Sequence, residues 1–198
     1  MLSYHKINIY RLILSQIDDT HEWFIFETLR PIGKAISACG SWIDKVAEKG
    51  NQDSLEATLD TETQLIETFL GVAFVVCQAH ITEVMSHVLF LHLRYKEKSG
   101  EDLKTCDGTK RGIMQLEDHR LAGTDYSRVQ LIDAAANYFK HSSEWHGDWE
   151  DLKNNQKRSA NILSTVGASR GSTGNLRTVS EYLGNHDYNN VLIFAQIL

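Results

Sequence analysis

The sequence has little proline and little cysteine. Pro31 is the single proline among 198 residues, and few stretches alternate apolar with polar residues, so the composition favours helices over a β-sheet. The three cysteines, Cys39, Cys77 and Cys106, lie far apart and form no CxxC pair, which argues against a disulfide framework and a thiolate zinc site. The sequence therefore predicts an all-α protein of a reducing compartment.

Long hydrophobic runs are also missing. The longest run, Phe69 to Cys77, is shorter than the stretch of about 20 residues that spans a bilayer, and the first residues lack the pattern of a signal peptide. We therefore expect a cytoplasmic protein without a membrane partner. With 42% hydrophobic and 23% charged residues, the chain 1–198 is most simply one domain with a substantial core.

Capping signals and helical spacing organise the first part of the chain. Asp19 with Glu22 resembles a capping box, so a helix is expected from there to Gly50, after an N-terminal arm at residues 1–18. Several apolar residues of this segment keep helical spacing: Trp23, Phe26, Leu29, Ile32 and Ile36. Residues 51–60 are polar and are expected to form a loop.

The longest expected helix follows this loop. Thr61 with Gln64 forms a second capping box, and Gly100 ends the helix at about Lys98. A stripe of apolar residues predicts one core face: Leu70, Phe74, Cys77, Ile81, Val84, Met85 and Val88. A helix of this length predicts the spine of a bundle of four or more helices.

Residues 100–124 are expected to form a long connection with a short helix near Met114–Arg120. Connections of this length are uncommon and are often functional. Asp125 is then expected to cap a helix over 126–146 that Gly147 ends.

The expected helix at 126–146 carries polar residues that are placed by periodicity. At about 100° per residue, Asp133, Asn137 and His141 lie on one face, which Lys140 and Glu144 extend on either side. Such polar groups beside apolar residues are costly to bury without partners. This face is therefore expected either to meet water or to line a cleft.

Asn137-Tyr-Phe-Lys140-His141, after a run of alanines, resembles the signature region of HEPN domains (higher eukaryotes and prokaryotes nucleotide-binding). These domains are small all-α bundles, and many are metal-independent endoribonucleases of toxin–antitoxin and phage-defence systems. In the family an arginine precedes the histidine with four to six residues between the two. Here residues 134–136 are alanine, so Lys140 or an arginine from elsewhere, such as Arg94, would have to take its place.

The resemblance implies that His141 performs acid/base chemistry on an RNA 2′-hydroxyl. It implies that Asp133 or Asn137 orients the imidazole and that Lys140 meets a phosphate. It further implies a homodimer that works without a metal or other cofactor. The expected partners are RNA and an antitoxin or another protein.

A basic segment also predicts contact with phosphate. The chain has a net charge of −6, yet the residues from Leu152 to Ser180 include no Asp or Glu and five basic residues: Lys153, Lys157, Arg158, Arg170 and Arg177. Asp148 is expected to cap a helix from about Trp149 to Val166, which carries part of this charge, and residues 167–175 are expected to form a flexible loop. The candidate RNA contacts are Lys157, Arg158, Arg170 and Arg177, although a solvated helix face explains Lys157 equally well.

Trp145 and Trp149 follow the polar face directly. Two indoles four residues apart are typical either of platforms that stack bases or of packing at a helix end. We include both as candidate RNA contacts and expect at least one of them to belong to the core.

Two other functions stay open. The chain is alternatively a non-catalytic helical module that binds a partner protein through the polar face of 126–146. A metal-dependent helical enzyme would use His80, Glu83 and His87, which lie within about 60° of one another on the long helix. The HExxH order and the paired Glu-x-x-His of ferritin-like centres are absent from the sequence, so a metal is not expected.

Overall fold

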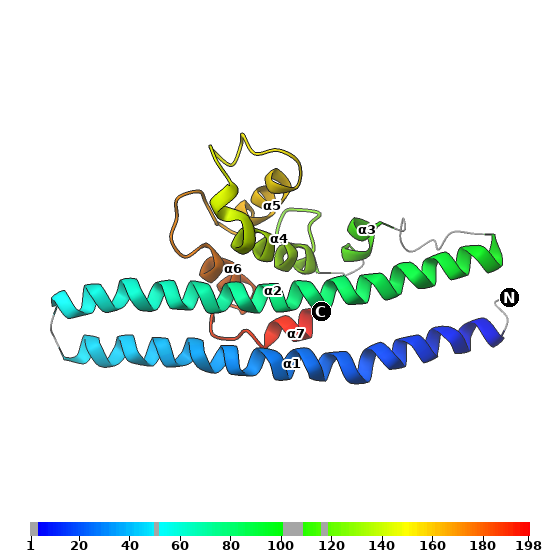
Figure 1. Cartoon of the computed structure of the whole chain (residues 1–198), viewed down its shortest axis with the longest axis horizontal. Coiled ribbons are helices and arrows are strands. Elements are labelled where there is room, and N and C mark those ends of the chain that lie inside the picture. Colours follow the sequence, from blue (N-terminus) through cyan, green and yellow to red (C-terminus); the bar gives the residue numbers. More distant parts are fainter. Residues whose placement is uncertain (1–3, 50–51, 101–108, 116–118) are drawn as a thin grey trace.

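The computed structural model describes residues 4–49, 52–100, 109–115 and 119–198. Within these ranges the chain forms helices and turns and no β-strand, so the predicted all-α class is confirmed. Two long helices, α1 (Tyr4–Glu48) and α2 (Gln52–Ser99), form an antiparallel hairpin, and the later helices α4, α5 and α6 gather on one side of α2 (Figure 1).

Both long helices extend beyond the boundaries that their capping sequences predict. Residues 4–18, expected as an arm, are already part of α1, and residues 52–60, expected as a loop, belong to α2. The capping boxes at Asp19 and Thr61 are therefore interior to helices. Local capping is worth about 1 kcal/mol, and the packing of α1 against α2 carries both helices past these signals, since most helical stability comes from tertiary contacts.

The core lies along α2, as its apolar stripe predicts. Leu70, Phe74 and Cys77 are fully buried, and Ile81 and Met85 are 4% exposed. α2 packs against α1, α3, α4 and α6, so the long central helix of the bundle is confirmed.

The other side of this core comes from α1 and from the last helix, α7 (Ile193–Ile197). Phe194 of α7 stacks on Phe74 with ring centroids 4.8 Å apart. In α1 the buried face contains Ile25, Leu29 and Ile36, whereas Trp23 is 65% exposed. Trp23 keeps helical spacing but lies outside the buried face, because the buried residues follow an i, i+4, i+11 series that starts at Ile25.

α2 is also long and apolar enough, by length and composition alone, to cross a membrane. Within Leu55–Arg94 an 18-residue window has a mean hydropathy of 1.6, and 44% of that window is buried inside the protein. The longest apolar run does not reveal that α2 is apolar enough to cross a membrane, because the hydropathy is spread along the helix.

Among the described residues, the expected connection and the polar face that follows it contain one helix each, α3 and α4. α3 (Lys110–Met114) lies before the segment expected to be helical at Met114–Arg120, and α4, which carries the polar face, spans Arg128–His141. α4 ends short of residue 146 because a 3₁₀ turn, Ser142–Glu144, follows it directly.

α4 is capped by Ser127 and not by Asp125. The Ser127 Oγ accepts a hydrogen bond from the Gln130 N–H at 3.2 Å, and the Gln130 Oε1 accepts one from the Ser127 N–H at 3.0 Å. This is a complete capping box. The Ser127 hydroxyl also donates to the Met114 carbonyl oxygen at 2.6 Å, so the cap ties the start of α4 to the end of α3.

The remaining helices are α5 (Asn154–Ser164) and α6 (Asn175–Leu183). α5 begins later than the expected Trp149, so Asp148 is not its cap; residues 149–151 form a turn instead. α4 packs on α2 on one side and on α5 on the other. α4 therefore lies between α2 and α5.

Candidate functional site

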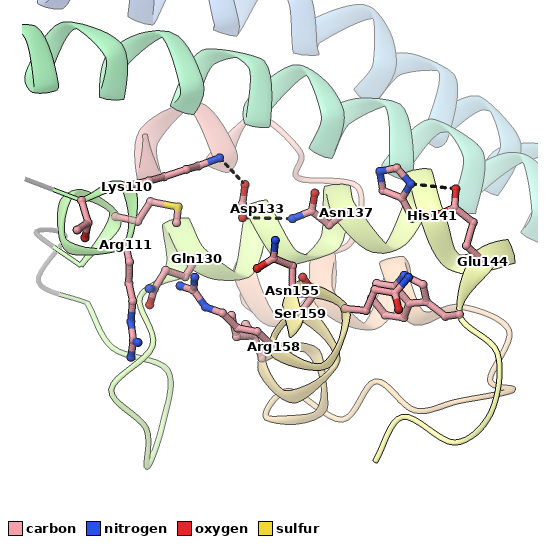
Figure 2. Close-up of a pocket in the computed structure, with 15 residues that line it drawn as sticks. Lys110, Arg111, Gln130, Asp133, Asn137, His141, Glu144, Asn155, Arg158 and Ser159 are labelled. Atoms are coloured by element: carbon pink, nitrogen blue, oxygen red, sulfur yellow. Dashed lines mark hydrogen bonds and ion pairs between the residues drawn. The ribbon is translucent and has the colours of Figure 1, made fainter. Parts of the chain in front are cut away.

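A cleft with a volume of about 610 Å³ opens between α3, α4 and α5 (Figure 2). Gln130, Asp133, Asn137 and His141 form its α4 wall. Of the two environments expected for this face, the structure shows the cleft. Three of the four predicted catalytic residues therefore share one site.

Three basic side chains line the same cleft. Lys110 and Arg111 come from α3, and Arg158 comes from α5. The Lys110 Nζ lies 3.6 Å from the Asp133 Oδ1, whereas Arg111 and Arg158 have no side-chain ion pair or hydrogen bond within the described part of the chain. Figure 2 shows Arg111 and Arg158 at one end of the cleft, beside Gln130, and His141 at the other end.

Gln78 of α2, which sequence reasoning missed, holds the polar face from behind. Its side-chain Nε2 donates to the Asp133 Oδ1 at 2.8 Å and to the Asn137 Oδ1 at 3.0 Å, and its Oε1 accepts from the Lys140 Nζ at 2.6 Å. Gln78 is 9% exposed. The Asn137 Nδ2 also donates to the Asp133 Oδ2 at 3.3 Å. This network fixes the carboxylate and the amide relative to α2.

The expected roles of the neighbours of His141 need correction. Asp133 and Asn137 bind each other and Gln78, whereas the His141 Nδ1 lies 3.2 Å from the Glu144 Oε1. The reason is that α4 ends at His141 and the following turn brings Glu144 back towards the ring. A hydrogen bond from Nδ1–H to this carboxylate leaves Nε2 as the proton acceptor.

Lys140 was expected to meet phosphate, and it is not among the residues that line the cleft. Its ammonium binds the side chain of Gln78 in α2, and the residue as a whole is exposed.

The alanines at positions 134–136 face the core. They are 1%, 0% and 0% exposed, so an arginine side chain at these positions would have to enter the packed interface of α4. The other candidate, Arg94, pairs with Glu97 at 3.0 Å and lies over the Phe90 ring. The guanidinium groups of the cleft come instead from Arg111 and Arg158.

The basic segment from Leu152 to Ser180 does not act as one patch. Arg158 lines the cleft, while the other three candidates are engaged elsewhere. The Lys157 Nζ donates to the Glu150 carbonyl oxygen at 2.7 Å, Arg170 pairs with Asp148 at 3.1 Å, and Arg177 pairs with Glu181 at 2.9 Å.

Trp145 and Trp149 form an aromatic cluster with Tyr138. The three rings meet edge to face with centroid distances of 5.5 Å, 6.0 Å and 6.2 Å. Trp145 is 8% exposed and belongs to the core, and Trp149 is half-buried against it. The expectation that at least one indole belongs to the core is confirmed, and Trp145 also lines the cleft.

Two buried donors of the cleft residues are without an acceptor. The Gln130 Nε2 and the Trp145 Nε1 have no hydrogen-bond partner in the described structure. A buried donor without a partner costs about 1–3 kcal/mol. Since both residues line the cleft, these donors mark it as a place for a ligand that carries acceptors.

The metal-dependent alternative finds no support in the structure. Among the described residues, no group of three or more His, Cys, Asp or Glu side chains is placed to hold a metal ion. His80, Glu83 and His87 share a helix face without forming such a site. His80 instead lines an apolar pocket of about 370 Å³ with Val129 and the C-terminal Leu198.

Comparison of the chain with protein-family models, with curated proteins and with solved structures finds no match.

Proposed function

We propose that this protein is an RNA-directed module of the HEPN type that binds single-stranded RNA in the cleft along α4. Cytoplasmic bacterial defence and toxin–antitoxin systems are the proposed setting. One observation carries the proposal. The polar face of α4, with Asp133, Asn137 and His141, shares a single cleft with Lys110, Arg111 and Arg158 from two other helices.

The charges of the cleft favour an anionic ligand. In a chain of net charge −6, the lining has three fixed positive groups against the carboxylates of Asp133 and Glu144. Both carboxylates are engaged, with Lys110 and His141 respectively. The guanidinium groups of Arg111 and Arg158 remain to bind phosphate, for which their planar fork is suited.

The His141–Glu144 pair supports acid/base chemistry at the other end. In RNA cleavage without a metal, the imidazole would take the proton of a 2′-hydroxyl, the oxygen would attack phosphorus, and the 5′-oxygen would leave with a proton. Transition-state charge at the phosphorane is stabilised by nearby cations. Because Arg111 and Arg158 lie away from His141 (Figure 2), we expect tight binding and slow cleavage.

The test uses total RNA in the presence of EDTA, with binding followed separately by filter retention. Wild type and His146→Ala, a matched control at an exposed neighbouring histidine, should bind RNA and cleave it slowly. His141→Ala should bind but not cleave. If wild type neither binds nor cleaves RNA, the proposal is wrong; if binding is intact and all three are equally inactive, the protein is an RNA binder only.

A second candidate function, a helical module that binds another protein, is favoured by the hairpin. Large apolar side chains are exposed on α1 and α2: Trp23 at 65%, Phe24 at 63%, Phe90 at 55% and Leu93 at 63%. Trp23 and Phe24 are adjacent in α1, and Phe90 and Leu93 lie three residues apart in α2. Exposed apolar patches often mark protein contacts. Light scattering, which gives the mass in solution, tests this candidate together with the proposed homodimer. A dimer that Phe90→Ser with Leu93→Ser converts to a monomer would favour this candidate.

A further inference from the structure

The N-terminus of α5 opens on the cleft without a side-chain cap. Lys153 occupies the capping position, and its side chain makes no capping hydrogen bond. The first turns of the helix contribute Asn155, Gln156 and Arg158 to the cleft lining. Free N–H groups and the helix dipole make such an end favourable for an anion.

Gln130 provides an independent indication of a ligand in the same cleft. Its side chain is 1% exposed, and its Oε1 is held by the Ser127 N–H in the capping box of α4. The amide orientation is therefore fixed, and the Nε2 donor is left without a partner in the described structure. Buried polar groups are normally hydrogen-bonded, and Gln130 lines the cleft, so an acceptor brought by a ligand would complete it.

Arg158 supplies the charge. Its side chain is half-buried in the wall of the cleft, and within the described residues it has no ion pair that would compete with a ligand. Figure 2 shows it at the Gln130 end. A guanidinium, an amide donor and a helix N-terminus are together a donor set for a phosphate monoanion or diester.

We propose that Arg158, Gln130 and the first turn of α5 form a phosphate-binding subsite that anchors RNA away from His141. The inference rests on the proposed RNA binding for the identity of its ligand. Gln130 and His141 are both on α4, and at about 1.5 Å per residue they are roughly 16 Å apart along its axis. The anchored phosphate is thus not the one that faces the imidazole, and the ligand is an oligonucleotide of several residues rather than a mononucleotide.

The first test compares Arg158→Gln with Lys157→Gln, which removes the same charge from an adjacent residue outside the cleft. Fluorescence anisotropy with a labelled oligouridylate gives the affinity of each at several salt concentrations. Arg158→Gln should bind about tenfold more weakly, and the slope of log affinity against log salt should fall by about 0.7, the value for one phosphate of a single strand. Lys157→Gln should match wild type. Equal losses in both variants would overturn the subsite.

The second test separates the subsite from the proposed function. Inorganic phosphate is titrated into isotope-labelled wild type and Arg158→Gln, and the side-chain amide of Gln130 and the backbone amides of Asn155 and Gln156 are followed by NMR. Wild type should show saturable shifts that the variant loses, with equal thermal midpoints for the two proteins. Shifts without RNA binding would retain the subsite and refute the function. If the protein binds RNA but phosphate does not shift these amide signals, the subsite is refuted and the proposed RNA binding is retained.

Discussion

Gln78 connects the candidate site to the spine of the bundle, and Gln78→Ala tests this connection. Its amide makes four hydrogen bonds: two with the charged groups of Asp133 and Lys140, one with the Asn137 side chain and a longer one, of 3.4 Å, with the Asp133 backbone oxygen. A hydrogen bond contributes about 0.5–1.5 kcal/mol, and one to a charged group about 1.5–3 kcal/mol. Because the partners are partly exposed to water, the lower ends apply. The expected loss is therefore about 3.5–4 kcal/mol.

A domain of this size loses about 2–4 °C in thermal midpoint per kcal/mol. Circular dichroism should therefore show a midpoint about 7–16 °C lower for Gln78→Ala. Gln64→Ala is the matched control, since Gln64 is exposed on the same helix, and substitutions of this kind stay within about 0.5 kcal/mol. Equal midpoints for the two variants would refute the argument that Gln78 holds the polar face of α4.

Three further predictions concern separate contacts. The ring of Phe139 occupies the space where a methyl group on Gly71 would lie; Gly71→Ala, which would gain about 0.5–1 kcal/mol in an open helix, should therefore lose about 1–3 kcal/mol through overpacking. Urea unfolding gives the sign, and a gain in stability would contradict the close approach of α2 and α4. Burial raises the pKa of Glu67 above 4.5, although the hydrogen bonds that its carboxylate accepts from the Arg177 and Leu176 N–H groups lower it. Folding thus favours its protonated form, and the stability of wild type relative to Glu67→Gln should be highest below pH 4.5 and fall as the pH rises above that value; urea titrations that show the difference growing with pH would exclude this. Burial also raises the pKa of the Cys77 thiol to about 12, so iodoacetamide should label Cys77 at neutral pH only after unfolding. Mass spectrometry of the native protein checks this, and rapid native labelling would contradict it.

The sequence predicts the core of this fold better than its helix ends. The apolar stripe from Leu70 to Met85 is buried as its spacing indicates, because periodicity reports directly on which face a helix buries. Helix ends depend on competition between local caps and tertiary packing. The packing of α1 on α2 overrides the signals at Asp19 and Thr61, whereas the capping box of Ser127 and Gln130 lies where a helix, α4, begins.

The sequence likewise predicts some residues of the candidate site and misses others. The shared face of Asp133, Asn137 and His141 follows from the geometry of one helix, so the sequence predicts it. Gln78 and Arg111 were missed because their approach to α4 depends on how separate segments pack. A Lys-Arg pair within the long connection at 100–124 was the available signal for the basic side of the cleft.

The most direct test of the central claim is the position of RNA on the protein. Thiouridine-substituted RNA is crosslinked to wild type by light, and the attached peptides are identified by mass spectrometry. The account predicts crosslinks in the peptides that line the cleft, those of α4 with Trp145 and of the first half of α5. Crosslinks confined to the α1–α2 hairpin, or spread evenly over the surface, would contradict it.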